Sequence, residues 1–96
     1  MIVEAGGARV GPLEAAQRIS EQLKGGGLVD ALVCLSHSGH DEDVTLAQQP
    51  FFDVIFGGHD HIPGFDGLSM KRTVGGGETL VVHGDPHGYS VACAEL

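Results

Sequence analysis

The first half of the chain carries a helical spacing of apolar residues after Gly11. Apolar side chains recur there at intervals of three and four, as on one face of a helix, at Leu13, Ala16, Ile19 and Leu23. Proline suits the first helical turn, and glycine commonly follows the last. The spacing therefore predicts a helix from Pro12 to Lys24 that ends at Gly25.

Two short apolar runs, Asp30 to Leu35 and Phe52 to Phe56, have the continuous pattern of strands. We expect both to be buried on both faces, as in a parallel sheet. Between them, Asp41 to Gln49 begins with acidic residues and continues with apolar ones, which predicts a short helix closed by Pro50. Helix, strand, helix and strand in this order predict an α/β fold with a parallel βαβ unit.

The last third of the chain has the pattern of antiparallel strands. Met70 to Val74 and Thr79 to His83 flank Gly75 to Gly77, which predicts a hairpin, and Tyr89 to Leu96 reads as a final strand. Residues 1–10 carry no regular pattern and are expected to be irregular or disordered. We interpret residues 1–96 as one partial domain.

Composition narrows the classes of function. The 13 acidic and 5 basic side chains give a net charge of −8, which excludes a basic face for nucleic acid or anionic membrane. Sixteen glycines and no tryptophan predict a thin core. No segment is long and apolar enough for a membrane span. Cys34 and Cys93 stand in apolar stretches far apart, which favours buried free thiols over a disulfide.

Three histidines follow the two predicted strands, His37 after the first and His59 and His61 after the second. Loops at the carboxyl ends of neighbouring parallel strands converge, so we expect these side chains to meet. Residues two apart in an extended loop point to the same side, so His59 and His61 can each bind one ion of a metal pair. Imidazole ligands favour a transition-type divalent ion such as Mn, Zn, Fe or Co.

Other chemistries fit less well. A serine nucleophile elbow needs glycine two residues before the serine, and Ser36 occupies that position before Ser38. Closely spaced cysteine pairs for a structural zinc site are absent. The other three histidines are expected on the surface or as hydrogen-bonded core residues: His40, His83 and His87.

Two segments resemble the calcineurin-like metallophosphoesterases of the 5′-nucleotidase and cyclic-phosphodiesterase branch. Ala31 to Gly39 is similar to that branch's strand ending in Ser-His-x-Gly, and Phe52 to His61 is similar to its Asp-x-Ile-x-Gly-Gly-His-x-His segment. The resemblance covers most of the chain from Gly11 onward. It implies a partial metallophosphoesterase sandwich with two divalent metal ions, His37 and His59 binding one and His61 the other.

The resemblance further implies hydrolysis of phosphate esters such as nucleotide 5′-monophosphates. The family's remaining ligands come from Asp-x-His, Gly-Asp and Gly-Asn-His motifs that precede this region, and none stands ahead of Ala31. The chain is thus expected to supply about half of a two-metal site, to show little or no turnover alone, and to self-associate through an uncovered face. The alternative is a non-catalytic fragment, or a metal-binding or interaction module, that keeps the α/β shape.

Overall fold

The computed structural model describes residues 3–5, 8–60, 68–72, 75–83 and 93–95. Two helices and six strands lie in these ranges. In chain order they are β1 Val3–Ala5, β2 Ala8–Val10, α1 Pro12–Leu23, β3 Val33–Leu35, α2 His40–Ala47, β4 Val54–Gly57, β5 Leu68–Lys71 and β6 Glu78–His83.

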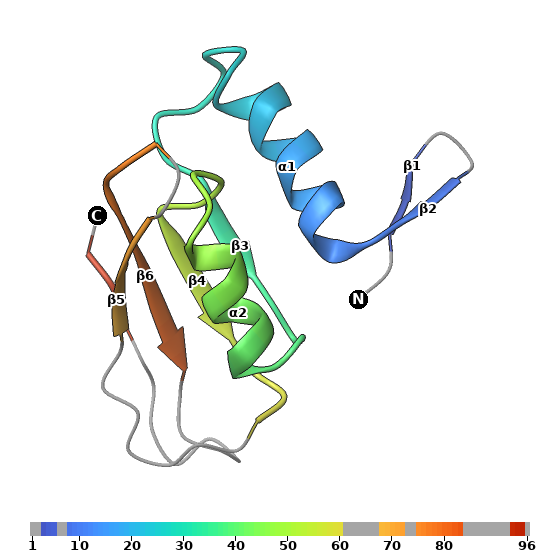
Figure 1. The fold of residues 1–96 in the computed structure, drawn as a ribbon. Coiled ribbons are helices and arrows are strands. Elements are labelled where there is room, and N and C mark those ends of the chain that lie inside the picture. Colours follow the sequence, from blue (N-terminus) through green and yellow to red (C-terminus); the bar gives the residue numbers. More distant parts are fainter. Residues whose placement is uncertain (1–2, 6–7, 61–67, 73–74, 84–92, 96) are drawn as a thin grey trace.

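Four strands form one mixed sheet in the order β3-β4-β6-β5 (Figure 1). β3 pairs with β4 in parallel, and β4 pairs with β6 in parallel. β5 and β6 pair antiparallel as the expected hairpin. The predicted α/β class with a parallel βαβ unit and a following antiparallel strand is confirmed. The parallel pairing of β6 with β4 was not predicted.

Helix α1 forms where the apolar spacing places it, with Pro12 in its first turn. Its buried residues are small, namely Ala15, Ala16 and Ser20. The larger residues of the same stripe, Leu13 and Ile19, are 40% and 44% exposed. The helix therefore meets the sheet through its small side chains and leaves part of its apolar face in solvent.

Helix α2 packs against β4, β5 and β6 and lies across one face of the sheet (Figure 1). Its first turn carries the acidic residues Asp41, Glu42 and Asp43, whose charge suits a helix amino terminus. Its buried face combines Asp43 with Leu46 and Ala47. The main apolar cluster joins both helices to the sheet and consists of Ala16, Leu46, Ala47, Phe51, Phe52, Ile55 and Val81.

Strand β4 is buried on both faces, as predicted, because the neighbouring residues Val54 and Ile55 are 2% and 0% exposed. The same expectation is wrong for β3. Val33 is 41% exposed and Leu35 81% exposed. The physical reason is position: β3 is the edge strand of the sheet, and only its partly buried Cys34 packs against the core.

The two ends of the chain also differ from expectation. Within residues 1–10, expected to be irregular, β1 and β2 pair antiparallel, and this hairpin lies beyond the start of α1, apart from the larger sheet (Figure 1). In the predicted final strand, residues 93–95 have no strand structure, and its other residues lie outside the described ranges. Neither described helix is long and apolar enough to cross a membrane.

Candidate metal centre

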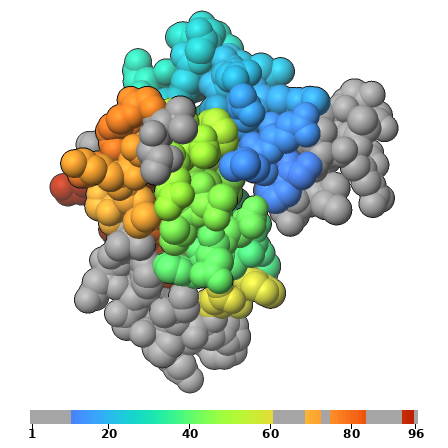
Figure 2. Space-filling view, viewed as in Figure 1, coloured from blue at the N-terminus to red at the C-terminus, as the bar shows by residue number. Residues whose placement is uncertain are grey.

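Parallel pairing brings the carboxyl ends of β3, β4 and β6 to one edge of the sheet. His37 lies two residues beyond the end of β3, His59 lies two residues beyond the end of β4, and His83 is the last residue of β6. The sheet therefore gathers histidines from three strands at one edge. Residues just before 60 reach the surface beside α2 (Figure 2, yellow against green).

The structure brings His37 and His59 together, as predicted. Nε2 of His37 lies 3.3 Å from Nδ1 of His59, and the ring centroids are 5.0 Å apart at 75°. Both side chains are exposed to solvent. Two nitrogens each about 2.0–2.1 Å from one tetrahedral ion lie roughly 3.3–3.4 Å apart, so this spacing fits two ligands of a single metal. The same spacing also permits a hydrogen bond between two neutral imidazoles.

The backbone of His59 adopts a left-handed conformation with φ of 76°. Few non-glycine residues do so, although histidine is among those enriched there, and such strain clusters at functional sites. Asp60 fixes the turn, because its N–H donates to the Gly58 carbonyl at 3.0 Å and its Oδ2 accepts from the His40 N–H at 2.6 Å. The loop that carries His59 is thereby attached to the start of α2.

Gly58 allows the two loops to approach each other. A β-carbon at this position would lie 3.2 Å from Nδ1 of His37. Such a contact is tighter than ordinary van der Waals packing and would displace the ring. The absence of a side chain at Gly58 therefore contributes to the close spacing of the His37 and His59 rings.

The third predicted ligand, His61, lies outside the described residues, as does His87. Within the described ranges, no group of three His, Cys, Asp or Glu side chains is arranged to hold a metal ion. His40 is half-buried, and its ring lies 5.6 Å from that of His83. The described residues thus bring together two of the three predicted ligands.

Sequence reasoning missed a buried polar cluster beneath the histidine pair. Asp43 is fully buried; its Oδ1 accepts a hydrogen bond from the Ser36 hydroxyl, and its Oδ2 lies 3.2 Å from Nε2 of His83. His83 is 2% exposed, which confirms the expectation of a hydrogen-bonded core histidine. A signal for Asp43 was present, because it stands three and four residues before the apolar Leu46 and Ala47 and so shares their face of the helix.

Two neighbouring groups limit the chemistry of this edge. Burial, with a smaller contribution from the charge of Asp43, raises the pKa of the Cys34 thiol, which keeps it protonated and makes it a poor metal ligand. Ser38, next to His37, has a buried hydroxyl with no hydrogen-bond partner among the described residues.

Both cysteines are free, as expected, but Cys93 is exposed and Cys34 only partly buried, so the prediction of burial is wrong for Cys93.

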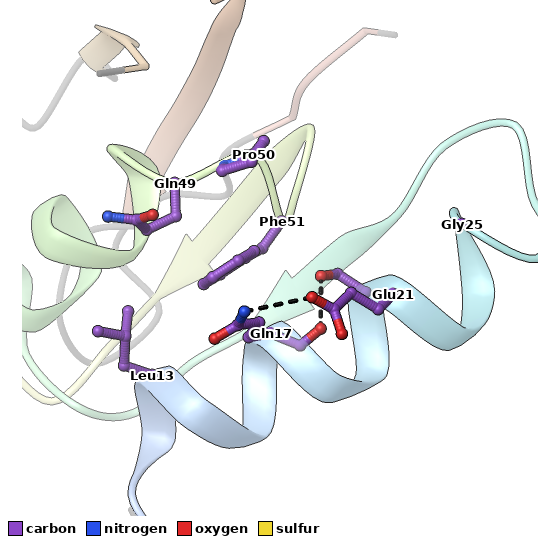
Figure 3. A pocket seen from close by; sticks show the side chains of 8 residues that line it. Leu13, Gln17, Glu21, Gly25, Gln49, Pro50 and Phe51 are labelled. Carbon is purple, nitrogen blue, oxygen red and sulfur yellow. Dashed lines mark hydrogen bonds between the residues drawn. The ribbon is translucent and has the colours of Figure 1, made fainter. Parts of the chain in front are cut away.

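One cavity among the described residues has no histidine in its lining. It has a volume of about 450 Å³ and lies between α1 and the segment that enters β4 at its amino end (Figure 3). Leu13, Gln17 and Glu21 line it from the helix, and Phe51 lines it from the opposite side (Figure 3). The cavity therefore does not form part of the candidate metal centre.

The chain was compared with protein-family models, with curated proteins and with solved structures, and none of the three comparisons found a match.

Proposed function

We propose that His37, His59 and His61 bind divalent metal ions and that the chain supplies about half of a two-metal site for hydrolysis of phosphate esters. The observation that supports the proposal most directly is the 3.3 Å spacing of the His37 and His59 nitrogens at the carboxyl edge of a parallel sheet. Nucleotide 5′-monophosphates or related phosphomonoesters and diesters are the proposed substrates. Imidazole nitrogens favour Mn, Zn, Fe or Co over magnesium or calcium.

Each residue has a separate part in this proposal. The His37 and His59 rings, both open to solvent, hold Nε2 and Nδ1 3.3 Å apart, a spacing at which both nitrogens can bind one ion. Gly58 leaves the space that this arrangement needs. A bound pair of divalent ions would activate water and neutralise charge on a phosphoryl group. The chain's own acidic character makes such ions necessary, because its net charge of −8 would otherwise repel a phosphate ester.

Metal titration of the purified chain tests the proposal. We expect Zn²⁺ or Mn²⁺ to bind, measured by calorimetry, and His37→Ala or His59→Ala to weaken binding at least about tenfold because each variant removes a direct ligand. His40→Ala is the matched control, since it removes a half-buried neighbouring histidine that is not assigned to the metal. Unchanged affinity in both ligand variants would rule out this centre.

Hydrolysis assays test whether the chain supplies only about half of the two-metal site. With p-nitrophenyl phosphate and its diester, we expect little or no metal-dependent turnover from this chain alone, because three neutral ligands without an anionic bridge hold metal weakly. Rapid turnover abolished by His59→Ala would show that the chain is a complete enzyme. It would contradict the proposal that the chain supplies only half of the site.

A non-catalytic interaction module is the second candidate. It is favoured by an apolar groove of about 230 Å³ beside the exposed edge strand β3, where α1 contributes Ile19 and the strand contributes Val33 and Leu35. Exposed apolar surface of this kind commonly marks a contact with another protein. Association that is independent of metal, together with no metal binding, would favour this candidate over the phosphoesterase.

A further inference from the structure

We propose that Asp43 is a positioning residue that sets the spacing of His37 and His59 by holding both of their loops from below. This inference rests on the proposed metal centre. Asp43 lies on α2, and neither of the two histidines lies on that helix. It is 0% exposed, so it is not available as a direct ligand at the surface where the two rings lie.

The first contact of the Asp43 carboxylate, through Oδ1, holds the loop that carries His37. The Ser36 hydroxyl donates to Oδ1 of Asp43, and the Ser36 backbone N–H donates to the Phe56 carbonyl at 2.8 Å. The same hydroxyl oxygen accepts from the Ser38 N–H at 3.3 Å. The backbone is therefore fixed on both sides of His37, and Asp43 sets the orientation of the hydroxyl that joins these contacts.

The second contact, through Oδ2, holds the start of the loop that carries His59. A β-carbon on Gly57 would lie 2.1 Å from Oδ2 of Asp43 and 2.2 Å from Nε2 of His83. The carboxylate and the imidazole therefore pack directly against the Gly57 backbone. Because Gly57 is the last residue of β4, this contact defines where the strand ends and the turn to His59 begins.

The chemistry of the cluster favours a positioning role over a purely stabilising one. Burying a carboxylate is costly, and even a well-paired buried ion pair adds little net stability compared with apolar packing. Hydrogen-bonded groups behind a metal ligand, by contrast, hold it in place, and their removal typically lowers metal affinity 10–100-fold. Binding sites need their ligands held within about 0.5 Å, which a bridge between two loops supplies.

The test compares Asp43→Ala, Asp43→Asn and Ser36→Ala with two controls on α2. Asparagine keeps the shape of the side chain and still accepts a hydrogen bond from the Ser36 hydroxyl, so it should rescue most of the affinity. Ser36→Ala removes the hydrogen bond between Ser36 and Asp43 and leaves the contact through Oδ2. It tests the inference if Asp43→Ala does not fold. The controls are Asp41→Ala, an exposed acid in the same turn, and Thr45→Ala, which removes an exposed hydroxyl.

Zn²⁺ affinity is measured by calorimetry under conditions in which circular dichroism shows each variant to be folded. We expect Asp43→Ala and Ser36→Ala to weaken Zn²⁺ binding roughly 10–100-fold, Asp43→Asn to stay within about fivefold of the parent, and both controls to match the parent. Parent-like affinity in a folded Asp43→Ala or Ser36→Ala protein would overturn the inference.

A metal-free measurement separates this inference from the proposed function. In the parent protein without metal, the close rings of His37 and His59 should give an NMR ring-to-ring Overhauser effect, and Ser36→Ala should lose it while Thr45→Ala keeps it. If the parent binds no Zn²⁺, the proposed metal centre fails, and the ring contact alone decides the positioning role. A ring contact that persists in Ser36→Ala would then reject the positioning role of Asp43.

Discussion

At the scale of single residues, Gly57 has the tightest surroundings of any described glycine. The nearest atoms to a β-carbon added at Gly57 belong to Asp43 and His83, both of which are buried and cannot move into solvent. Gly11 has the opposite surroundings, with nothing within 4 Å of that position. The two glycines therefore provide a matched pair for asking what one methyl group costs.

We expect Gly57→Ala to lower the free energy of unfolding by roughly 1–3 kcal/mol, because the added methyl group overpacks the buried cluster. Gly11→Ala should cost less, about 0.5–1 kcal/mol, because the methyl group meets no other atom and the only loss is that alanine is a poorer N-cap than glycine. Urea denaturation followed by circular dichroism measures both values. Equal stability of the two variants would mean that the cluster relaxes freely around Gly57.

At the scale of elements, periodicity predicted the helices well. The spacing of apolar residues after Pro12 placed α1, and the acidic first turn with the closing Pro50 placed α2, each within one or two residues of the observed bounds. The sequence pattern also predicted the hairpin of β5 and β6 from the three glycines between the two apolar runs. Local patterns of this kind need no knowledge of the neighbouring elements.

Two features of the sheet depend on tertiary contacts and therefore could not be predicted from local sequence patterns. The run that forms β3 has the apolar composition of a central strand, yet the strand lies at the sheet edge. The insertion of β6 between β4 and β5 is set by tertiary pairing rather than by its own residues. Of the candidate site, the meeting of His37 and His59 was predictable from strand order. Asp43 was missed although it shares a helix face with Leu46 and Ala47, because an acidic residue near a helix start normally faces solvent.

The exposed edge strand leads to a prediction about association. Leu35 is 81% exposed and lines the apolar groove between α1 and β3. If the chain self-associates through this groove, Leu35→Lys should weaken association about tenfold or more, since burial of one leucine contributes about 1.5–3 kcal/mol and a charge at an edge strand opposes pairing. Sedimentation velocity over a range of concentrations measures the effect.

Leu28→Lys is the control for this experiment. Leu28 is 73% exposed but lies outside the groove, after the end of α1. An equal effect of the two substitutions would indicate general apolar association rather than contact through β3.

At the scale of the whole molecule, Asp53 connects segments that are distant in sequence. Its Oδ2 accepts from the Leu32 N–H at 2.8 Å and lies 3.0 Å from Nζ of Lys24, at the end of α1. Its Oδ1 lies 3.5 Å from the Arg72 guanidinium, next to β5. One carboxylate thus links the first helix, the approach to β3 and the hairpin.

The surroundings of Asp53 give the fold a defined response to acid. Burial alone raises the pKa of this carboxyl, but the Leu32 N–H, Lys24 and Arg72 together outweigh it and lower the pKa below its usual value. A lowered folded-state pKa means that the carboxylate stabilises the fold above its unfolded pKa of about 3.9 and that this contribution is lost as pH falls through the folded-state value.

Asp53→Asn should therefore cost about 1 kcal/mol of unfolding free energy at neutral pH, a modest value because the side chain is 30% exposed. The difference from the parent should narrow as pH falls below about 4. Urea titrations at pH 7, 5 and 3 measure it, with the exposed Asp30→Asn as the control. A difference that stays constant across this range would exclude the carboxylate charge as its cause.

The position of β6 has a consequence for how the protein is made. β6 lies between β4 and β5, and its residues 78–83 come last in the chain among the four strands of this sheet. During synthesis, the ribosome releases β3, α2 and β4 well before the strand that covers the inner edge of β4 emerges. Val54 and Ile55 must stay without that partner until Leu80 and Val81 arrive, so the nascent chain passes through an interval in which chaperone binding competes with sheet closure.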